Sequence, residues 1–183
     1  MRPTSVSDLV RLEQSGVSID LLLFYGHGPG AGTGTGCLSQ WWPARFTVDG
    51  VGYRSAEHFM MAQKARLFGD RELFERIVAA EHPKVAKDLG RQVRGFDERV
   101  WVAERFTIVV RGTVAKFSAD EVIRDHLLGT GDRVLAEASP TDRVWGIGLG
   151  RDDERARRPS LWLGTNLLGF ALMEARDRLR RPT

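Results

Sequence analysis

The sequence predicts an α+β protein that is mostly helical, with a small sheet or hairpin. Stretches with the helical spacing of apolar residues fill most of the chain after residue 55, whereas strand-like stretches are few. The pair Asp49-Gly50, between two short apolar stretches, is a strong hairpin signal. A length of 183 residues with 42% hydrophobic content suits a globular fold with a sizeable core. We therefore expect one compact domain over residues 1–183.

The first part of the chain predicts a helix followed by a strand. Residues 5–15 place their apolar side chains on one side of a helix that Gly16 ends. This helix makes residues 1–18 an N-terminal extension. Residues 19–25 form a short apolar run with the composition of a buried strand.

A glycine-rich stretch, residues 26–36, predicts a mobile loop. It departs from the dinucleotide-binding fingerprint because Thr33 stands where the third glycine belongs. It also differs from a nucleotide-binding Walker loop, because no lysine precedes Lys64. A flexible insertion is the plainer interpretation, and a phosphate-cradling role is the alternative.

Local start and stop signals mark the remaining elements. Ser55 and Asp97 suit helix N-caps, and Pro83 suits a first helical position. Ser118 and Glu121 have the spacing of a capping box. In chain order we expect a hairpin at 45–54, helices at about 55–67 and 70–80, a helix from Pro83, helices at 98–117 and from 118 to Gly129, strands at 133–138 and 144–149, a loop at 151–160 and a helix at 166–180.

Composition excludes several classes of protein. No apolar run approaches the roughly 20 residues of a membrane span, and charged residues interrupt the N-terminus where a secretory signal would be apolar. Cys37, the one cysteine, forms neither an internal disulfide nor a cysteine zinc site. A net charge of +3 is too small for wrapping a nucleic-acid backbone but is compatible with a phosphate-bearing small ligand. We expect a cytoplasmic protein with no membrane partner.

The helix expected at 55–67 carries the most informative polar pair. Glu57 and Lys64 are seven residues apart, so they lie two turns apart on nearly the same face, among apolar neighbours. A carboxylate in such surroundings needs a partner or shifts its pKa, as a general acid or base requires. The alternative is a Glu that interacts with the helix dipole beside an exposed Lys. His58 by itself suits a core or capping histidine, and Ala62 stands where a second metal-binding histidine would be needed.

Two tryptophans offer aromatic faces. Trp101 lies early in the expected long helix, where a core role is the alternative to stacking on a ligand. Trp145 is followed by Gly146, Gly148 and Gly150. Alternate glycines of this kind would expose backbone N–H groups beside an aromatic ring, which suits a heterocycle attached to a phosphorylated sugar. A tight turn that needs glycine for backbone reasons is the alternative.

Taken in order, the motifs of the chain resemble the NADAR superfamily, the YbiA-like N-glycosidases, over residues 19–181. Two departures leave substrate choice open: the usual Leu-Ser-Asn-Phe is Leu38-Ser39-Gln40-Trp41 here, and Met61 replaces a common Gln. The matching residues are Leu38-Ser39, Trp41-Trp42-Pro43-Ala44, Phe46, Val48-Asp49-Gly50, Glu57-His58, Gln63-Lys64, Leu89-Gly90-Arg91, Trp101, Lys116-Phe117, Thr130, Glu137, Asp142, Trp145-Gly146, Gly148, Asn166, Gly169, Met173 and Arg176.

The resemblance implies hydrolysis of an N-glycosidic bond by a compact, mostly helical domain with a central site. Such a reaction passes through an oxocarbenium-like state, which a carboxylate near C1′ stabilises. We assign the catalytic roles to Glu57, as general base or electrostatic stabiliser, and to Asp142, which assists or holds ribose hydroxyls. The residues expected to bind substrate are Ser39, His58, Lys64 (phosphate or leaving base), Trp101 and Trp145 (the base), Gly146, Gly148, and Asn166 (phosphate or sugar).

The expected substrates are phosphorylated ribosylamino-pyrimidine intermediates of riboflavin biosynthesis. Family members that remove ADP-ribose from guanine in nucleic acid give a second enzymatic hypothesis, with ADP-ribosylated nucleic acid as partner. A non-catalytic module that binds ADP-ribose or NAD is a third. Retention of both Glu57 and Asp142 favours an enzyme. We expect no cofactor and no metal.

Overall fold

The computed structural model describes residues 3–26 and 34–180. The chain divides into two compact units, which we call unit 1 (Met1–Ser39 with Asp125–Thr183) and unit 2 (Gln40–Arg124). Helices dominate both units, and the strands within the described ranges form two separate two-stranded sheets. This confirms the predicted α+β class with a small sheet and a hairpin. The prediction of one domain over residues 1–183 stays a prediction.

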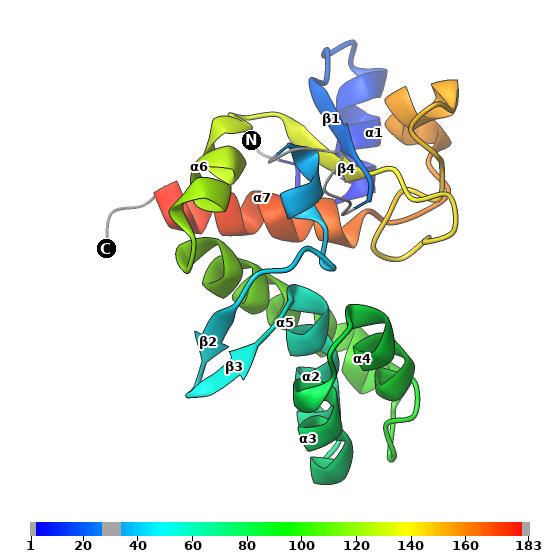
Figure 1. Cartoon of the computed structure of the whole chain (residues 1–183). Coiled ribbons are helices and arrows are strands. Elements are labelled where there is room, and N and C mark those ends of the chain that lie inside the picture. The colour runs from blue at the N-terminus through cyan, green and yellow to red at the C-terminus, as the bar shows by residue number, and fades with distance from the viewer. Residues whose placement is uncertain (1–2, 27–33, 181–183) are drawn as a thin grey trace. The chain divides into compact units, whose positions relative to one another are not determined.

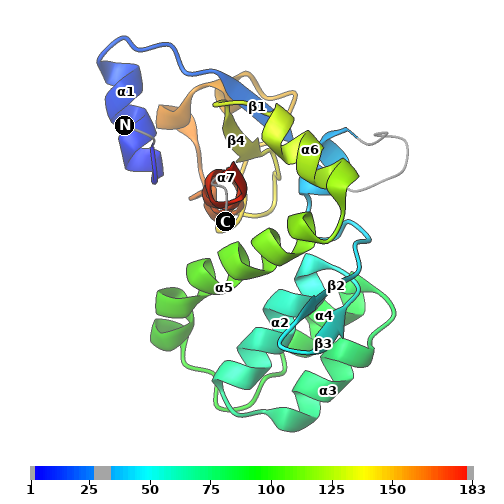
Figure 2. The same ribbon diagram turned by 90° about the vertical axis from the view of Figure 1, so that its left-hand side faces the viewer.

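Unit 1 is built around a parallel strand pair that covers a helix. Strand β1 (Leu21–Phe24) pairs with β4 (Val134–Glu137), Leu21 opposite Val134, and α7 (Leu167–Arg180) packs against β4 (Figure 1). Figure 2 shows both strands above α7, which is seen there along its axis. Leu135, Leu168 and Leu172 are fully or almost fully buried in this layer. Helix α1 (Val6–Gln14) contributes Leu9 to the core, so the N-terminal extension is packed rather than peripheral.

Unit 2 is a helical layer closed by the predicted hairpin. Strands β2 (Phe46–Val48) and β3 (Val51–Tyr53) are antiparallel, with Asp49 and Gly50 at positive φ in the turn. Phe46, Tyr53 and Phe59 form an aromatic cluster beneath the hairpin. The helices are α2 (Ala56–Leu67), α3 (Arg71–Ala79), α4 (Pro83–Gly90) and α5 (Glu98–Ser118). Helix α6 (Glu121–Gly129) comes next in the sequence and contains the division between the two units, after Arg124.

The helices of unit 2 begin where their capping residues predict. Ser55 accepts a hydrogen bond from the N–H of His58, and Asp97 accepts from Arg99 and Val100. Pro83 occupies the first turn of α4, where its missing N–H costs nothing. Helix α5 packs closely on α2 because Gly112 has no side chain: a Cβ there would lie 2.4 Å from the Phe59 ring.

Three local predictions were wrong. Residues 144–149 form bends rather than a strand, because their backbone groups bond to other segments of unit 1, as described below. Ser118 is the last residue of α5, and Asp120 caps α6 by accepting from the N–H groups of Val122 and Ile123. The expected loop at 151–160 contains two 3-10 helices, η3 (Glu154–Arg157) and η4 (Pro159–Leu161).

The glycine-rich stretch is described only at its ends. Residues 27–33, which include Thr33, lie outside the described residues. At its C-terminal end the expected loop is already ordered, since the 3-10 helix η2 (Thr35–Leu38) buries Cys37 and Leu38. No helix in the described part of the chain is long and apolar enough to span a bilayer.

Candidate functional site

The residues expected to carry the chemistry are divided between the two units. Four of them, Glu57, His58, Lys64 and Trp101, belong to the helices of unit 2. The remaining six belong to unit 1: Ser39, Asp142, Trp145, Gly146, Gly148 and Asn166.

Glu57 lies in the first turn of α2 with only 3% of its surface exposed. Its backbone N–H donates to the carbonyl of Gln40 at 3.0 Å, which ties the segment before the hairpin to the start of the helix. Every residue of α2 from Ala56 to Gln63 is buried, so this part of the helix is packed on all sides. The Glu57 carboxylate is therefore largely removed from bulk water, which suits a general acid or base.

His58, next to Glu57, makes its contacts within the protein. Its ring Nδ1 lies 2.7 Å from Ser55 Oγ, and its Nε2 lies 3.1 Å from the carbonyl of Ala80. Because that carbonyl only accepts, Nε2 carries the hydrogen and Nδ1 accepts from the Ser55 hydroxyl. Burial lowers the pKa of His58, in keeping with a neutral ring. Neither ring nitrogen is left for a substrate, so His58 positions α2 and does not fit the expected ligand contact.

Lys64 and Trp101 are brought together in unit 2. The Lys64 ammonium donates to the carbonyl of Gly90 at 2.8 Å and lies 5.7 Å from the centre of the Trp101 ring. It also lies 4.2 Å from the centre of the Phe96 ring, which is 45% exposed. Burial lowers the pKa of Lys64. Sequence reasoning missed Phe96, which lies far from Lys64 along the chain and has no distinctive spacing.

In unit 1 the turn that contains Asp142 and Trp145 uses its amides internally. One oxygen of Asp142, Oδ1, accepts from the N–H of Val144 at 2.8 Å and of Trp145 at 2.7 Å. The N–H of Gly148 donates to the carbonyl of Asp142, and that of Ile147 to the carbonyl of Glu137. We predicted that backbone N–H groups around these glycines would be exposed. For the N–H groups of Trp145 and Gly148 this prediction is wrong, because both have partners within the turn.

The carbonyls of the same turn occupy the N-terminus of α7. The N–H groups of Asn166, Leu167 and Leu168 donate at 3.1 to 3.2 Å to the carbonyls of residues 146, 144 and 145, respectively. These are the donors that would otherwise bind an anion at a helix start. The expectation that the head of α7 orients a phosphate is therefore wrong.

Asn166 is a structural residue in this arrangement. It is fully buried at φ 53°, and its amide donates to the carbonyl of Leu135 at 2.9 Å while accepting from the N–H of Glu137 at 3.1 Å. These are the two bonds that a further strand would make to β4. Gly146 meets this edge so closely that a Cβ would lie 2.9 Å from the Glu137 carbonyl. Ser39, 8% exposed, ends η2 and donates its N–H to Gly36.

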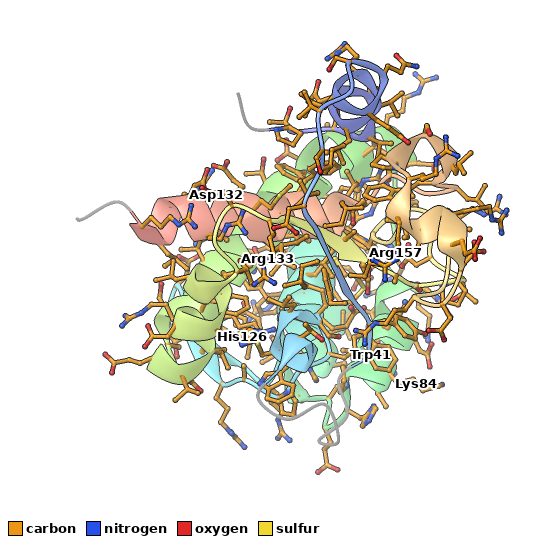
Figure 3. All side chains as sticks on the ribbon, turned by 90° about the horizontal axis from the view of Figure 1, so that it is seen from above. Trp41, Lys84, His126, Asp132, Arg133 and Arg157 are labelled. Carbon is orange, nitrogen blue, oxygen red and sulfur yellow. The ribbon has the colours of Figure 1, made fainter. Side chains whose placement is uncertain are left out.

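Each unit also contains a hollow away from these residues. One in unit 2, about 400 Å³, lies between the hairpin turn and α3 and is lined by Asp49, Arg66 and Phe74 among others. One in unit 1, about 450 Å³, is lined by His126 and Arg133, which are labelled in Figure 3. None of the expected site residues is among the described residues that line them. Within residues 3–26 and 34–180, no cluster of three His, Cys, Asp or Glu side chains is placed to hold a metal ion.

Comparison with known proteins places the chain in a family. Residues 23–180 match the NADAR domain, so the chain belongs to the NADAR family. It is 41% identical over 144 residues to N-glycosidase R617 of Acanthamoeba polyphaga mimivirus, covering 76% of this chain and 85% of that protein. It is 32% identical over 145 residues to N-glycosidase Npun_R5314 of Nostoc punctiforme, covering 79% and 86%.

Two further comparisons concern a longer relative and a solved structure. The chain is 32% identical over 138 residues to the chloroplastic riboflavin biosynthesis protein PYRR of Zea mays, which covers 72% of this chain but 20% of that protein. The NMR structure of the E. coli protein YbiA is similar with a TM-score of 0.68 at 27% identity, covering 89% of this chain and 86% of YbiA. The fold of the chain is therefore that of YbiA.

Proposed function

We propose that this chain is an N-glycosidase that hydrolyses the C1′–N bond of phosphorylated ribosylamino-pyrimidine intermediates of riboflavin biosynthesis. The reaction class, hydrolysis of an N-glycosyl compound, rests on the relatives named N-glycosidase in a mimivirus and in Nostoc. The substrate class is supported by the riboflavin biosynthesis proteins among the relatives. The observation that carries the proposal for the site is that one buried helix, α2, bears both Glu57 and Lys64, whose ammonium lies near the ring of Trp101 on α5.

Glu57 supplies the negative charge in this proposal. As the C1′–N bond breaks, positive charge develops at C1′ and the ring oxygen, and a fixed carboxylate stabilises it. The same carboxylate accepts a proton from the water whose oxygen bonds to C1′. A buried carboxylate on a rigid helix needs little reorganisation during this step.

Lys64 and Trp101 act on the leaving base. The base stacks on the Trp101 ring. As the C1′–N bond breaks, its electron pair moves to the nitrogen of the leaving base, and the Lys64 ammonium donates a hydrogen bond to the base. Because burial lowers its pKa, Lys64 is a better proton donor than an exposed lysine. The proton that the leaving nitrogen needs comes from this group, and the bulk solvent restores it.

Asp142 keeps its proposed role with one change. Since its Oδ1 holds two backbone amides, it shapes the turn that carries Trp145, and only Oδ2 is proposed to meet ribose hydroxyls. The substitution Asp142→Asn tests this, because the amide oxygen still accepts from the two N–H groups. Retained folding with weakened binding of ribose supports a substrate contact, whereas unchanged binding restricts Asp142 to the turn.

The substrate is tested by mass spectrometry of the purified protein with two candidate substrates in parallel. One is a ribosylamino-pyrimidine phosphate, and the other is DNA with ADP-ribosylated guanine. Release of ribose 5-phosphate from the first alone supports the proposal. Release of ADP-ribose from the second alone assigns the chain to the guanine ADP-ribosyl hydrolases, and binding of ADP-ribose without turnover of either makes it a binding module. Glu57→Gln is the inactive control for each arm.

A further inference from the structure

Helices α2 and α4 of unit 2 run side by side in the same direction (Figure 1). Near the start of both, His58 Nε2 bonds to the carbonyl of Ala80; near their ends, Lys64 Nζ bonds to the carbonyl of Gly90. Gly90 lets the helices approach, since a Cβ there would lie 2.2 Å from Met61 Sδ. The start of α4 therefore lies beside the Glu57 end of α2.

An aromatic ring at this end is flanked by a lysine and a histidine side chain. Trp41 directly follows Gln40, whose carbonyl holds the N–H of Glu57. The half-buried Trp41 ring lies 5.8 Å from Lys87 Nζ, and it meets the ring of His82 edge-on at 6.1 Å. Arg54 lies close enough to His58 for its charge to add to the lowering of the His58 pKa that burial causes.

The side chains around Trp41 differ from their neighbours on α4 in their ion pairs. Among the residues that the structure describes, Arg54, His82 and Lys87 form no ion pair, although Glu81 adjoins His82 in the sequence. Lys84, one turn from Lys87 on α4 and labelled with Trp41 in Figure 3, pairs with Asp88 at 3.0 Å. Asp88 is near enough for the Lys87 charge to add to the lowering of its pKa, but the hydrogen bonds of its carboxylate go to Lys84 and Arg91. Lys87 and Arg54 therefore leave a net positive charge near Trp41, which an anionic ligand would neutralise.

We propose that Arg54 and Lys87, with the His82 ring beside them at Trp41, bind the 5′-phosphate of the ribosyl substrate. This inference rests on the proposed function. The order of groups along α2 fits the substrate: the base lies at Lys64 and Trp101, C1′ at Glu57, and the phosphate at the start of the helix. Glu57 and Lys64 are separated by about 10 Å of helix rise. Lys64, half-buried and bonded to Gly90, is thereby left to the base rather than to the phosphate.

The test is a titration of wild type, Lys87→Ala and Lys84→Ala with ribose 5-phosphate, ribose and ADP-ribose. Lys84→Ala is the matched control, because it removes the same charge from the same helix but from a side chain that Asp88 already neutralises. We expect Lys87→Ala to weaken ribose 5-phosphate binding by about tenfold or more, with Lys84→Ala within about twofold of wild type. Ribose binding stays the same in all three proteins. Equal weakening by both variants overturns the proposal, since it indicates a general charge effect.

Kinetic constants separate this inference from the proposed function. With turnover of a ribosylamino-pyrimidine phosphate, Lys87→Ala raises KM about tenfold and changes kcat little, and Lys87→Arg restores KM. Turnover with a KM indifferent to Lys87 overturns the phosphate site and leaves the proposed function intact. Ribose 5-phosphate binding that depends on Lys87, without turnover of any N-glycoside, retains the phosphate site and overturns the function. The proposal is also overturned if Lys87→Ala weakens the binding of ADP-ribose but leaves the binding of ribose 5-phosphate unchanged.

Discussion

The start of α2 in unit 2 and the turn at 142–150 in unit 1 both carry residues that the sequence marks as functional, yet they are built in opposite ways. In α2 the Glu57 side chain is buried, and the half-buried Lys64 donates its ammonium to the carbonyl of Gly90. In the turn, the backbone and the polar side chains bond to β4 and α7. The polar and glycine residues of this turn therefore have a structural explanation in their contacts with β4 and α7, whereas Glu57 stands out by its charge among buried neighbours.

The largest effect is expected at Glu57. Replacing it by Gln keeps the shape but removes the negative charge opposite C1′, so kcat falls about 10³-fold, and ribose 5-phosphate binding persists. Product release followed by mass spectrometry gives the rates. Glu104→Gln, an exposed acid on α5, is the control and keeps the wild-type rate. If Glu57→Gln keeps full activity, the start of α2 is as structural as the turn at 142–150, and the difference between the two regions is contradicted.

Gly164 tests whether the turn is structural. A Cβ at this position would lie 2.3 Å from the carbonyl oxygen of Gly146 and 2.8 Å from the Cα of Arg143. Because both obstacles are backbone atoms, Gly164→Ala lowers the free energy of unfolding by about 2–4 kcal/mol. Urea denaturation measures this, with Gly52→Ala, whose Cβ would meet no atom within 4 Å, as the control. Equal stability of the two variants contradicts the close packing described for the turn.

Asn166 gives a smaller and sharper test of the same region. Asn166→Gly tolerates the positive φ but leaves the buried N–H of Glu137 and C=O of Leu135 unpaired, at a cost of about 1–3 kcal/mol. Denaturation and ribose 5-phosphate titration are measured on the same protein. A structural Asn166 loses stability and keeps affinity per folded molecule. The reverse result returns Asn166 to the substrate contacts expected from the sequence.

The smallest effect is expected in the pH dependence of unit 2. Lys64 donates only while protonated, and burial lowers its pKa, so kcat declines with rising pH before an ordinary lysine, with a pKa of about 10.4, would titrate. In Lys64→Arg the side chain stays charged, so we expect no decline of kcat between pH 7 and 10, even if kcat itself is severalfold lower than in the wild type. A pH profile from 7 to 10 of both proteins measures it. An alkaline decline that is identical in the two proteins excludes Lys64 as its source.

The elements that the sequence predicted well are those with local signals. Ser55, Asp70 and Asp97 each accept from a backbone N–H two or three residues ahead, so three residues suffice to mark the start of a helix. The segment 144–149 was misjudged because its alternating glycines resemble a strand, and their reason is distant: Gly146 abuts the carbonyl of Glu137. No short window of sequence contains both sides of such a contact.

The candidate site shows the same division. Lys64 and Trp101 were each expected to bind substrate from the family resemblance. The structure brings the two together and adds Phe96 and the Gly90 carbonyl, which only tertiary folding brings near. His58 was predicted to contact the ligand, although a histidine at this position also suits the core. In the structure both of its ring nitrogens bond to protein groups, Ser55 and the carbonyl of Ala80, so it positions α2. The prediction of an anion site at α7 was wrong because a sequence does not show whether the backbone N–H groups at a helix start already have hydrogen-bond partners.

The parallel pairing of β1 with β4 has a consequence for how the chain folds. Leu21 and Val134 are neighbours in the sheet, yet the whole of unit 2 lies between them in the sequence. Closing such a long loop costs conformational entropy that hairpins and neighbouring helices avoid, and contacts of this kind form slowly. On the ribosome, β1 emerges early and stays without its partner strand until residues 134–137 have been made. We therefore expect the contacts of unit 2 to form first and the β1–β4 pair to be the late, rate-limiting step of folding.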